Sequence, residues 1–230
     1  MPWSERNGTV TRAFDEWRLT DRDIRAYLKF GLRVTEQAYN DIWERAAQEP
    51  AWDDSPELVD VFHDGIDGVW PNDFNWMFLS GVLKDAVTAY EIYMEKAFEG
   101  VLRWHGLTMT HLTDKRSLPW NKLCDHYRDG LDIHLAEHDG IAEVRDLRHI
   151  LTHKRGELRT DQDRARFGTD GDGWIGLEVD LDAGAVPRHL DTLAASVRIV
   201  DPPVWEGSCG RAPSDQLLRY LGRYQEPDGT

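Results

Sequence analysis

The chain has 230 residues, of which 30% are charged and 10% aromatic, and its formal net charge is −15 at pH 7. This length allows one domain with a buried core, and the composition excludes a disordered chain. The negative charge excludes a protein that coats nucleic acid nonspecifically, and two cysteines, Cys124 and Cys209, are too few for a disulfide framework.

The N-terminal stretch MPWSERNGTV has no apolar core, so we expect no signal peptide. The most apolar run, WMFLSGVL, stops at Lys84 and is too short to cross a membrane. Together with cysteines that we expect to be reduced, these features predict a cytoplasmic protein with no membrane partner.

The first half of the chain is predicted to be helical. Thr20 is typical of a helix N-cap, and the apolar spacing after it predicts a helix to about Gln48. A proline-containing loop follows, with a short helix expected at residues 57–66. The strongest element is predicted from Phe74 to His105, where apolar residues recur at helical spacing until Gly106 ends the run. We expect this segment to be the central helix of a bundle.

Shorter elements are predicted in the second half. A helix is expected after Ser117, and the stretch LDIHLAEHDG is ambiguous between a loop and a short helix. The next helix is predicted from Ile141 to about Leu158, followed by a polar loop, TDQDRARFGTDGDG. Alternating side chains then predict a half-exposed strand at residues 177–182.

A helix is predicted from Pro187 to about Val200, where it ends before the two prolines of DPPVWEG. A last short helix is predicted from Ser214 to about Tyr224. The fold class predicted from these elements is all-α: a helical bundle with a small β-structured appendage. We assign the bundle to residues 1–160. Residues 161–230 are predicted to form the appendage, a strand or hairpin with short helices, packed on the same domain.

A basic stretch stands out in this acidic chain. Residues 145–166 hold seven Arg or Lys and four Asp or Glu, a local balance of +3 that leaves −18 for the rest. At 100° per residue, Val144, Leu147 and Leu151 lie on one side of the predicted helix. The other side carries a polar arc without an acidic member, formed by Arg145, Arg148, His149, Thr152 and His153.

Two interpretations of this arc are open. Arginine presents a planar set of donors that fits phosphate, and histidine can transfer a proton near neutral pH, so the arc suits metal-independent cleavage of RNA. In the other interpretation it is a solvated helix end, where Lys154 and Arg155 interact favourably with the helix dipole.

The segment LRHILTH, residues 147–153, resembles the R-x(4–6)-H motif of the HEPN superfamily of helical-bundle proteins. Arg148 and His153 match the motif, and His149 stands where the family carries Asn, Asp or His. The resemblance covers about residues 20–160 in architecture. It implies an endoribonuclease that leaves 2′,3′-cyclic phosphate ends, in a toxin–antitoxin or phage-defence setting.

We therefore predict Arg148, His153 and His149 as catalytic residues. The residues predicted to bind RNA are Arg145, Thr152, Lys154, Arg155 and Arg159. We expect no metal and no other cofactor. The resemblance implies a homodimer whose two copies share one cleft, and it leaves room for an antitoxin or defence-system partner.

Two alternatives remain. The first is a HEPN module that binds RNA or a nucleotide without cleaving it, as part of a larger complex. The second is a zinc hydrolase, because HLAEH spells the H-x-x-E-H pattern with His134, Glu137 and His138. That chemistry requires both histidines on one stable helix and a further ligand.

Overall fold

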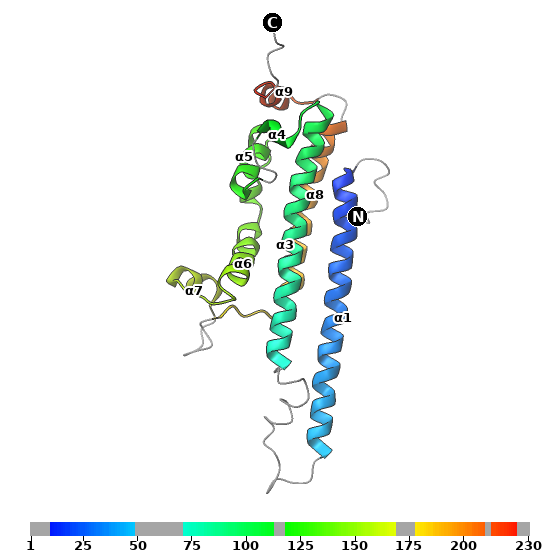
Figure 1. Ribbon diagram of the computed structural model, residues 1–230, viewed down its shortest axis with the longest axis vertical. Coiled ribbons are helices and arrows are strands. Elements are labelled where there is room, and N and C mark those ends of the chain that lie inside the picture. The colour runs from blue at the N-terminus through cyan, green and yellow to red at the C-terminus, as the bar shows by residue number, and fades with distance from the viewer. Residues whose placement is uncertain (1–9, 49–70, 113–117, 169–177, 210–212, 225–230) are drawn as a thin grey trace. The chain divides into compact units, whose positions relative to one another are not determined.

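The computed structural model describes residues 10–48, 71–112, 118–168, 178–209 and 213–224 (Figure 1). Its elements are α1 (Arg12–Gln48), α3 (Pro71–Trp104), α4 (Met109–Leu112), α5 (Trp120–Leu131), the 3₁₀ helix η2 (Leu135–Glu137), α6 (Ile141–His153), α7 (Asp161–Phe167), α8 (Ala185–Cys209) and α9 (Asp215–Leu221). The predicted all-α class is confirmed. None of these described helices is long and apolar enough to cross a membrane.

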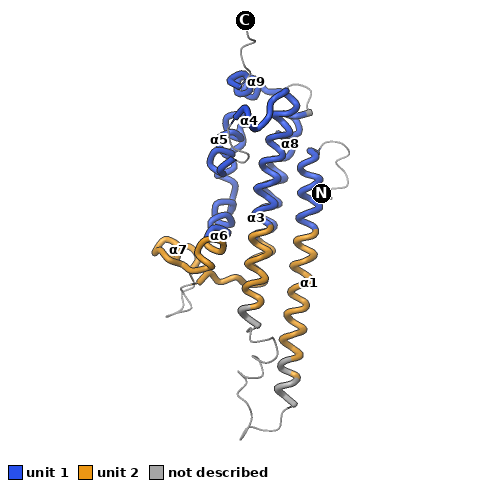
Figure 2. The backbone as a smooth tube through the Cα atoms, in the orientation of Figure 1, with its two compact units in different colours: residues 1–22, 86–149, 189–230 blue, residues 23–85, 150–188 orange. Residues whose placement is uncertain are grey.

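The chain divides into two compact units (Figure 2). Unit 1 comprises residues 1–22, 86–149 and 189–230, and unit 2 comprises residues 23–85 and 150–188. Helices α1, α3, α6 and α8 each contribute residues to both units. Each unit also combines residues from both sides of the boundary predicted at residue 160.

In unit 1, the beginning of α1 is held by a buried threonine. The hydroxyl of Thr11 accepts a hydrogen bond from a backbone N–H of the first turn and donates to Asp201 Oδ1 at 2.7 Å. The helix therefore begins at Arg12, and the predicted cap at Thr20 is wrong. Thr20 lies within α1, where its hydroxyl donates to the carbonyl of Glu16 at 3.2 Å.

Three buried tyrosines form much of the core of unit 1, and each has a partner for its hydroxyl. Tyr93 donates to Asp201 at 3.3 Å, and Tyr127 donates to a backbone carbonyl of α3 at 2.8 Å. Tyr90 and Ser196 share a hydrogen bond of 2.8 Å. These partners satisfy the polar ends of rings that are almost completely buried.

The long helix predicted from Phe74 to His105 is confirmed as α3, with buried residues at helical spacing along it. The helices expected after Ser117 and from Ser214 are confirmed as α5 and α9. Ser214 caps α9 by accepting a hydrogen bond from Leu217 N at 3.1 Å. Ser117 and the helix predicted at residues 57–66 lie outside the described residues.

Helix α8 continues through two prolines, so the predicted end near Val200 is wrong. Pro202 and Pro203 lie inside the helix, although proline in a helix interior costs about 3 kcal/mol. The flanking Asp201 and Val204 are both buried in unit 1. The tertiary contacts of these neighbours hold the helix together where local preference alone would end it.

In unit 2, α1 and α3 meet through aromatic side chains. The rings of Tyr27 and Phe78 lie edge to face, with centroids 5.1 Å apart. The Phe78 ring occupies the place that a Cβ atom on Gly31 would take, so a larger residue there would require the ring to move. Trp76 donates its indole N–H to the carbonyl of Val179 at 2.9 Å, which ties α3 to the segment before α8.

The strand predicted at residues 177–182 is not formed within the described residues. Glu178 makes an isolated antiparallel bridge with Glu157, and residues 179–182 have no regular structure. Residue 177 lies outside the described part of the chain. The alternation of apolar residues instead reflects two buried side chains, Val179 and Leu181, on a segment that forms only this single bridge among the residues described.

The polar loop predicted after α6 contains a short helix, α7. Thr160 accepts from Asp163 N, and the Asp163 carboxylate accepts from Thr160 N, which together form a capping box. Lys154 Nζ lies 2.6 Å from the same carboxylate. The hydrogen bond from Lys154 is the main cause that lowers the pKa of Asp163 to about 2.

Candidate functional site

Helix α6 carries the residues that the sequence singles out, and its two sides differ as predicted. The buried residues are Ile141, Val144, Leu147, Ile150 and Leu151. On the other side, His149, Thr152 and His153 are exposed, while Arg145 and Arg148 are half-buried. Arg145, Arg148 and His149 belong to unit 1, and Thr152 and His153 belong to unit 2.

The helix ends at His153 rather than near Leu158 because the chain turns left-handed there. Arg155 and Gly156 have φ values of 54° and 85°, and Gly156 N donates to the carbonyl of Ile150 at 3.2 Å. This hydrogen bond joins residues six positions apart, across a glycine in the left-handed conformation that commonly ends a helix.

A second constraint acts on the same glycine. The Trp76 ring fills the space where a Cβ atom on Gly156 would lie. The loop after the predicted catalytic histidine is thus fixed by both backbone conformation and packing.

A carboxylate from α3 reaches the arginines of α6. Nε and an Nη atom of Arg145 each lie 3.0 Å from Glu91 Oε1, and an Nη atom of Arg148 lies 3.5 Å from Glu91 Oε2. The polar arc of α6 contains no acidic residue, but the Glu91 carboxylate of α3 places a negative charge beside its two arginines. The three side chains together carry a charge of +1.

Arg145 is held by a second contact, with an aromatic ring of α5. Its guanidinium carbon lies 4.1 Å from the ring centroid of Trp120, in cation–π geometry. The Tyr90 ring is an aromatic neighbour of this indole, with its centroid 5.9 Å away. The hydrogen-bond donors of Arg145 therefore contact Glu91, and the planar face of its guanidinium contacts Trp120. Arg148 makes one weaker contact with Glu91, and the rest of its guanidinium has no partner among the described residues.

The other residues predicted to bind RNA differ in their surroundings. Lys154 is paired with Asp163 at 2.6 Å, and Arg159 with Glu157 at 2.9 Å. Thr152 and Arg155 are exposed.

The HLAEH segment does not form the helix that the zinc interpretation requires. It includes η2, a single turn of 3₁₀ helix, in which His134 Nδ1 lies 3.1 Å from Glu137 Oε1. His138 is half-buried and shares a hydrogen bond of 2.7 Å with Ser196 Oγ. In the described part of the chain, no three His, Cys, Asp or Glu side chains gather as metal ligands would.

Glu91 and Trp120 are site residues that sequence reasoning missed. A signal for Glu91 exists, because Glu91, Glu95 and Glu99 recur at intervals of four and form an acidic line along one side of the helix. No local pattern marks Trp120 as the partner of Arg145. Their association depends on how α5 and α6 pack within unit 1.

No protein-family model matches the chain, and neither a curated protein nor a solved structure matches it.

Proposed function

We propose that the chain is a metal-independent endoribonuclease of the HEPN type, with its catalytic residues on α6. The observation that carries the proposal is the pair of arginines, Arg145 and Arg148, gathered around Glu91 on a helix that also exposes His149. One arginine is fixed by Trp120, and the other keeps donors for a ligand. In a chain of net charge −15, such a pair suits an anion such as an RNA phosphate.

The proposed reaction needs one cation and one or two proton carriers. His153 accepts the proton of a ribose 2′-OH, and the 2′-oxygen attacks the adjacent phosphorus. The bond from phosphorus to the 5′-oxygen breaks, and that oxygen takes a proton from a second carrier, for which we propose His149. Arg148 stabilises the negative charge that builds up on the phosphoryl oxygens. The products are a 2′,3′-cyclic phosphate and a 5′-hydroxyl.

We propose that a second copy of the chain completes the site. Arg148 and His153 are five positions apart, which is about 140° around a helix, so one copy presents them splayed. Unit 2 exposes several large apolar side chains, among them Tyr27, Phe30 and Met77. Exposed apolar groups of this kind mark contact surfaces, and a twofold contact needs only one such surface per copy.

The experiment is to incubate the protein with single-stranded RNA in EDTA and to identify the product ends. We expect cyclic-phosphate ends, and no cleavage of an oligonucleotide with 2′-deoxyribose throughout. Arg148→Ala and His153→Ala should each lower the rate by about 100-fold or more, since acid–base and electrostatic contributions have that size. Arg188→Ala, which changes an exposed arginine at the start of α8, is the matched control.

The outcomes separate catalysis from other roles. A double variant, Arg148→Ala with His153→Ala, that still cleaves RNA would overturn the catalytic assignment. Cleavage that is lost in EDTA and restored by zinc would transfer the activity to a metal site. Subunit exchange adds a further check: inactive Arg148→Ala and His153→Ala chains should regain part of the activity when mixed, because mixed dimers carry unequal cleft halves.

The second candidate is a module that binds RNA without cleaving it. The observation that favours it is Glu91, which already occupies both arginines with a negative charge. This candidate predicts RNA binding that depends on Arg148 but leaves the RNA intact. The assay of product ends described above distinguishes it from the endoribonuclease.

A further inference from the structure

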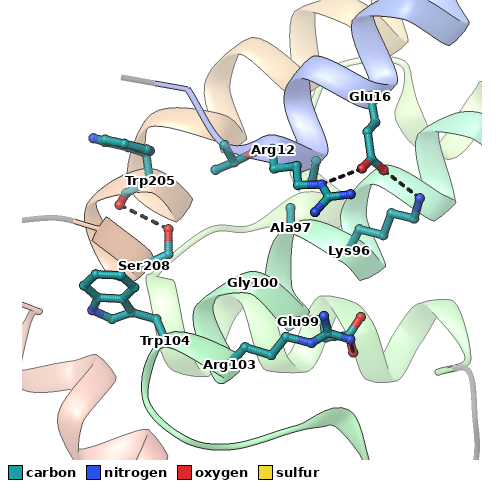
Figure 3. A pocket seen from close by; sticks show the side chains of 12 residues that line it. Arg12, Glu16, Lys96, Ala97, Glu99, Gly100, Arg103, Trp104, Trp205 and Ser208 are labelled. Atoms are coloured by element: carbon teal, nitrogen blue, oxygen red, sulfur yellow. Dashed lines mark hydrogen bonds and ion pairs between the residues drawn. The ribbon is translucent and has the colours of Figure 1, made fainter. Parts of the chain in front are cut away.

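A hollow in unit 1 lies apart from the side chains of α6 that the proposed reaction uses. Figure 3 shows it between the beginning of α1, the last turns of α3 and the last turns of α8. Its volume is about 470 Å³, within the usual range for a small-molecule site. All of its lining residues belong to unit 1.

The floor of the hollow is made by small residues. Ala13 of α1 and Ala97 and Gly100 of α3 line it. A Cβ atom built on Gly100 would meet no heavy atom within 4 Å, so the space above this turn of α3 is open. A flat group can therefore approach the backbone of α3 closely.

Two indole rings lie on one side of the hollow (Figure 3). Trp104, at the end of α3, is 63% exposed, and Trp205 of α8 is half-buried. An indole exposed to this extent leaves a large apolar face in water, and stacking of a ligand ring would cover it. Stacking of a nucleic-acid base on an aromatic side chain contributes about 1–3 kcal/mol.

Charged side chains line the other side. Glu16 lies between Arg12 Nε, at 2.9 Å, and Lys96 Nζ, at 2.8 Å (Figure 3). Arg103 and Glu99 form a further pair at 2.7 Å. Three cations thus face two carboxylates, which leaves one surplus positive charge beside the hollow.

The cations keep donors for a ligand. The Arg12 side chain is 93% exposed, and it bonds Glu16 through Nε, so its two terminal nitrogens have no partner in the described part of the chain. Ion pairs between exposed side chains contribute at most about 1 kcal/mol, so an incoming anion can share these cations. Such a surplus is notable in a chain of net charge −15.

We propose that this hollow binds a small organic anion with a flat aromatic ring, of the mononucleotide class. The ring stacks on Trp104, and the anionic group bonds Arg12 and Lys96. This site is separate from the proposed cleavage of RNA, and its test measures binding rather than cleavage, so either proposal can fail without the other.

The test uses the full chain and adenosine 5′-monophosphate, with isothermal titration calorimetry at low ionic strength. We expect saturable binding, and binding at least about tenfold weaker for adenosine, which lacks the anion, and for inorganic phosphate, which lacks the ring. A tenfold change corresponds to about 1.4 kcal/mol. Absence of saturable binding up to about 5 mM, a concentration that would detect even millimolar affinity, would overturn the proposal.

Variants locate the binding. Arg12→Gln and Trp104→Leu should each weaken binding of the nucleotide at least about tenfold. The controls are Arg33→Gln, also on α1, and Ile199→Leu, whose side chain on α8 is 58% exposed; both should bind as the wild type does. All four sites are exposed, and circular dichroism confirms that each variant folds.

Two results would overturn the assignment of the site or of the ligand class. If Arg148→Ala abolishes nucleotide binding while Arg12→Gln and Trp104→Leu leave it intact, the nucleotide binds at α6 and not in the hollow. If adenosine binds as tightly as its monophosphate, the cations do not recognise the ligand and the anion class is wrong.

Discussion

The carboxylate of Glu91 and the guanidinium of Arg148 lie 3.5 Å apart, on two different helices of unit 1. This contact places a negative charge beside the arginine that we propose to bind phosphate. An RNA phosphate would have to share Arg148 with Glu91, because both are anions with oxygens that accept the same donors. Glu91 is therefore expected to set how strongly this part of α6 attracts RNA.

Replacing Glu91 with glutamine should tighten the binding of single-stranded RNA, because Arg148 no longer shares its charge. The binding constant should also depend more steeply on salt, by about 0.7 in the logarithmic slope for each additional phosphate contact. Fluorescence anisotropy of a labelled RNA over a series of salt concentrations measures both effects. Glu143→Gln is the control, since it removes the same charge from an exposed position of α6. Equal effects of the two variants would mean that net charge alone is responsible.

Gly156→Ala should destabilise the protein. The residue has φ of 85°, which costs an alanine about 1–2 kcal/mol, and the new methyl group would collide with the Trp76 ring. We expect a loss of at least 2 kcal/mol in the free energy of unfolding from strain and collision together, about the size of a typical damaging substitution. Urea unfolding measures it. Gly100→Ala, in open space within α3, should be neutral or stabilising by up to about 1 kcal/mol.

Asp201→Ala should also lower stability, through lost acceptors in the core. The substitution leaves the buried hydroxyls of Thr11 and Tyr93 without this acceptor, and unsatisfied buried donors cost about 1–3 kcal/mol each. We expect a loss of about 2–4 kcal/mol in the free energy of unfolding. Glu206→Ala, an exposed change on the same helix, should alter stability by less than about 0.5 kcal/mol. A coupling energy near zero between Thr11→Ala and Asp201→Ala would contradict the hydrogen bond as the cause.

Stability should fall as the solution is acidified, partly because of His126. Its ring stacks on Phe98, and its Nδ1 lies 2.6 Å from the Tyr220 hydroxyl. Burial lowers the pKa of His126 below its usual value of 6.5. The imidazole therefore binds a proton more readily in the unfolded chain than in the folded protein. The folded state is fully stabilised above pH 6.5, and this stability is lost as the pH falls from 6.5 through the lower pKa of the folded state.

Thermal unfolding between pH 7.5 and 5.5 tests this assignment. His126→Phe keeps a ring against Phe98 but cannot be protonated, so its unfolding midpoint should fall less with acid than that of the wild type. An identical pH dependence in the wild type and His126→Phe would assign the effect to other groups, among them His138, whose pKa burial also lowers.

The all-α class and the buried sides of α3 and α6 could be predicted from the sequence, because apolar residues at helical spacing record burial directly. Helix ends were predicted less well. Thr11 and Thr20 have the same local preference for a cap, and only the contact of Thr11 with Asp201 decides between them. The left-handed turn at Gly156 carried a local signal, a glycine after the last basic residues of the helix, that the prediction did not use.

The composition of the candidate site was only half predictable. Arg148, His149 and His153 lie within six consecutive residues and could be proposed from their spacing on one helix. Glu91 and Trp120 reach Arg145 from two other helices, and no periodicity along one segment records such a meeting. Surroundings of this kind follow from tertiary packing, which determines how much of each arginine is left for a ligand.

The hydrogen bond between Thr11 and Asp201 joins positions 190 residues apart, nearly the two ends of the chain. During synthesis, the first helix leaves the ribosome long before its anchor exists. At a synthesis rate of about 5–20 residues per second, Asp201 is added roughly 10–40 seconds after Thr11. Closing so long a loop costs conformational entropy, and this cost is offset only when contacts between the two distant segments form. The beginning of the chain is therefore among the last parts that can take their final place.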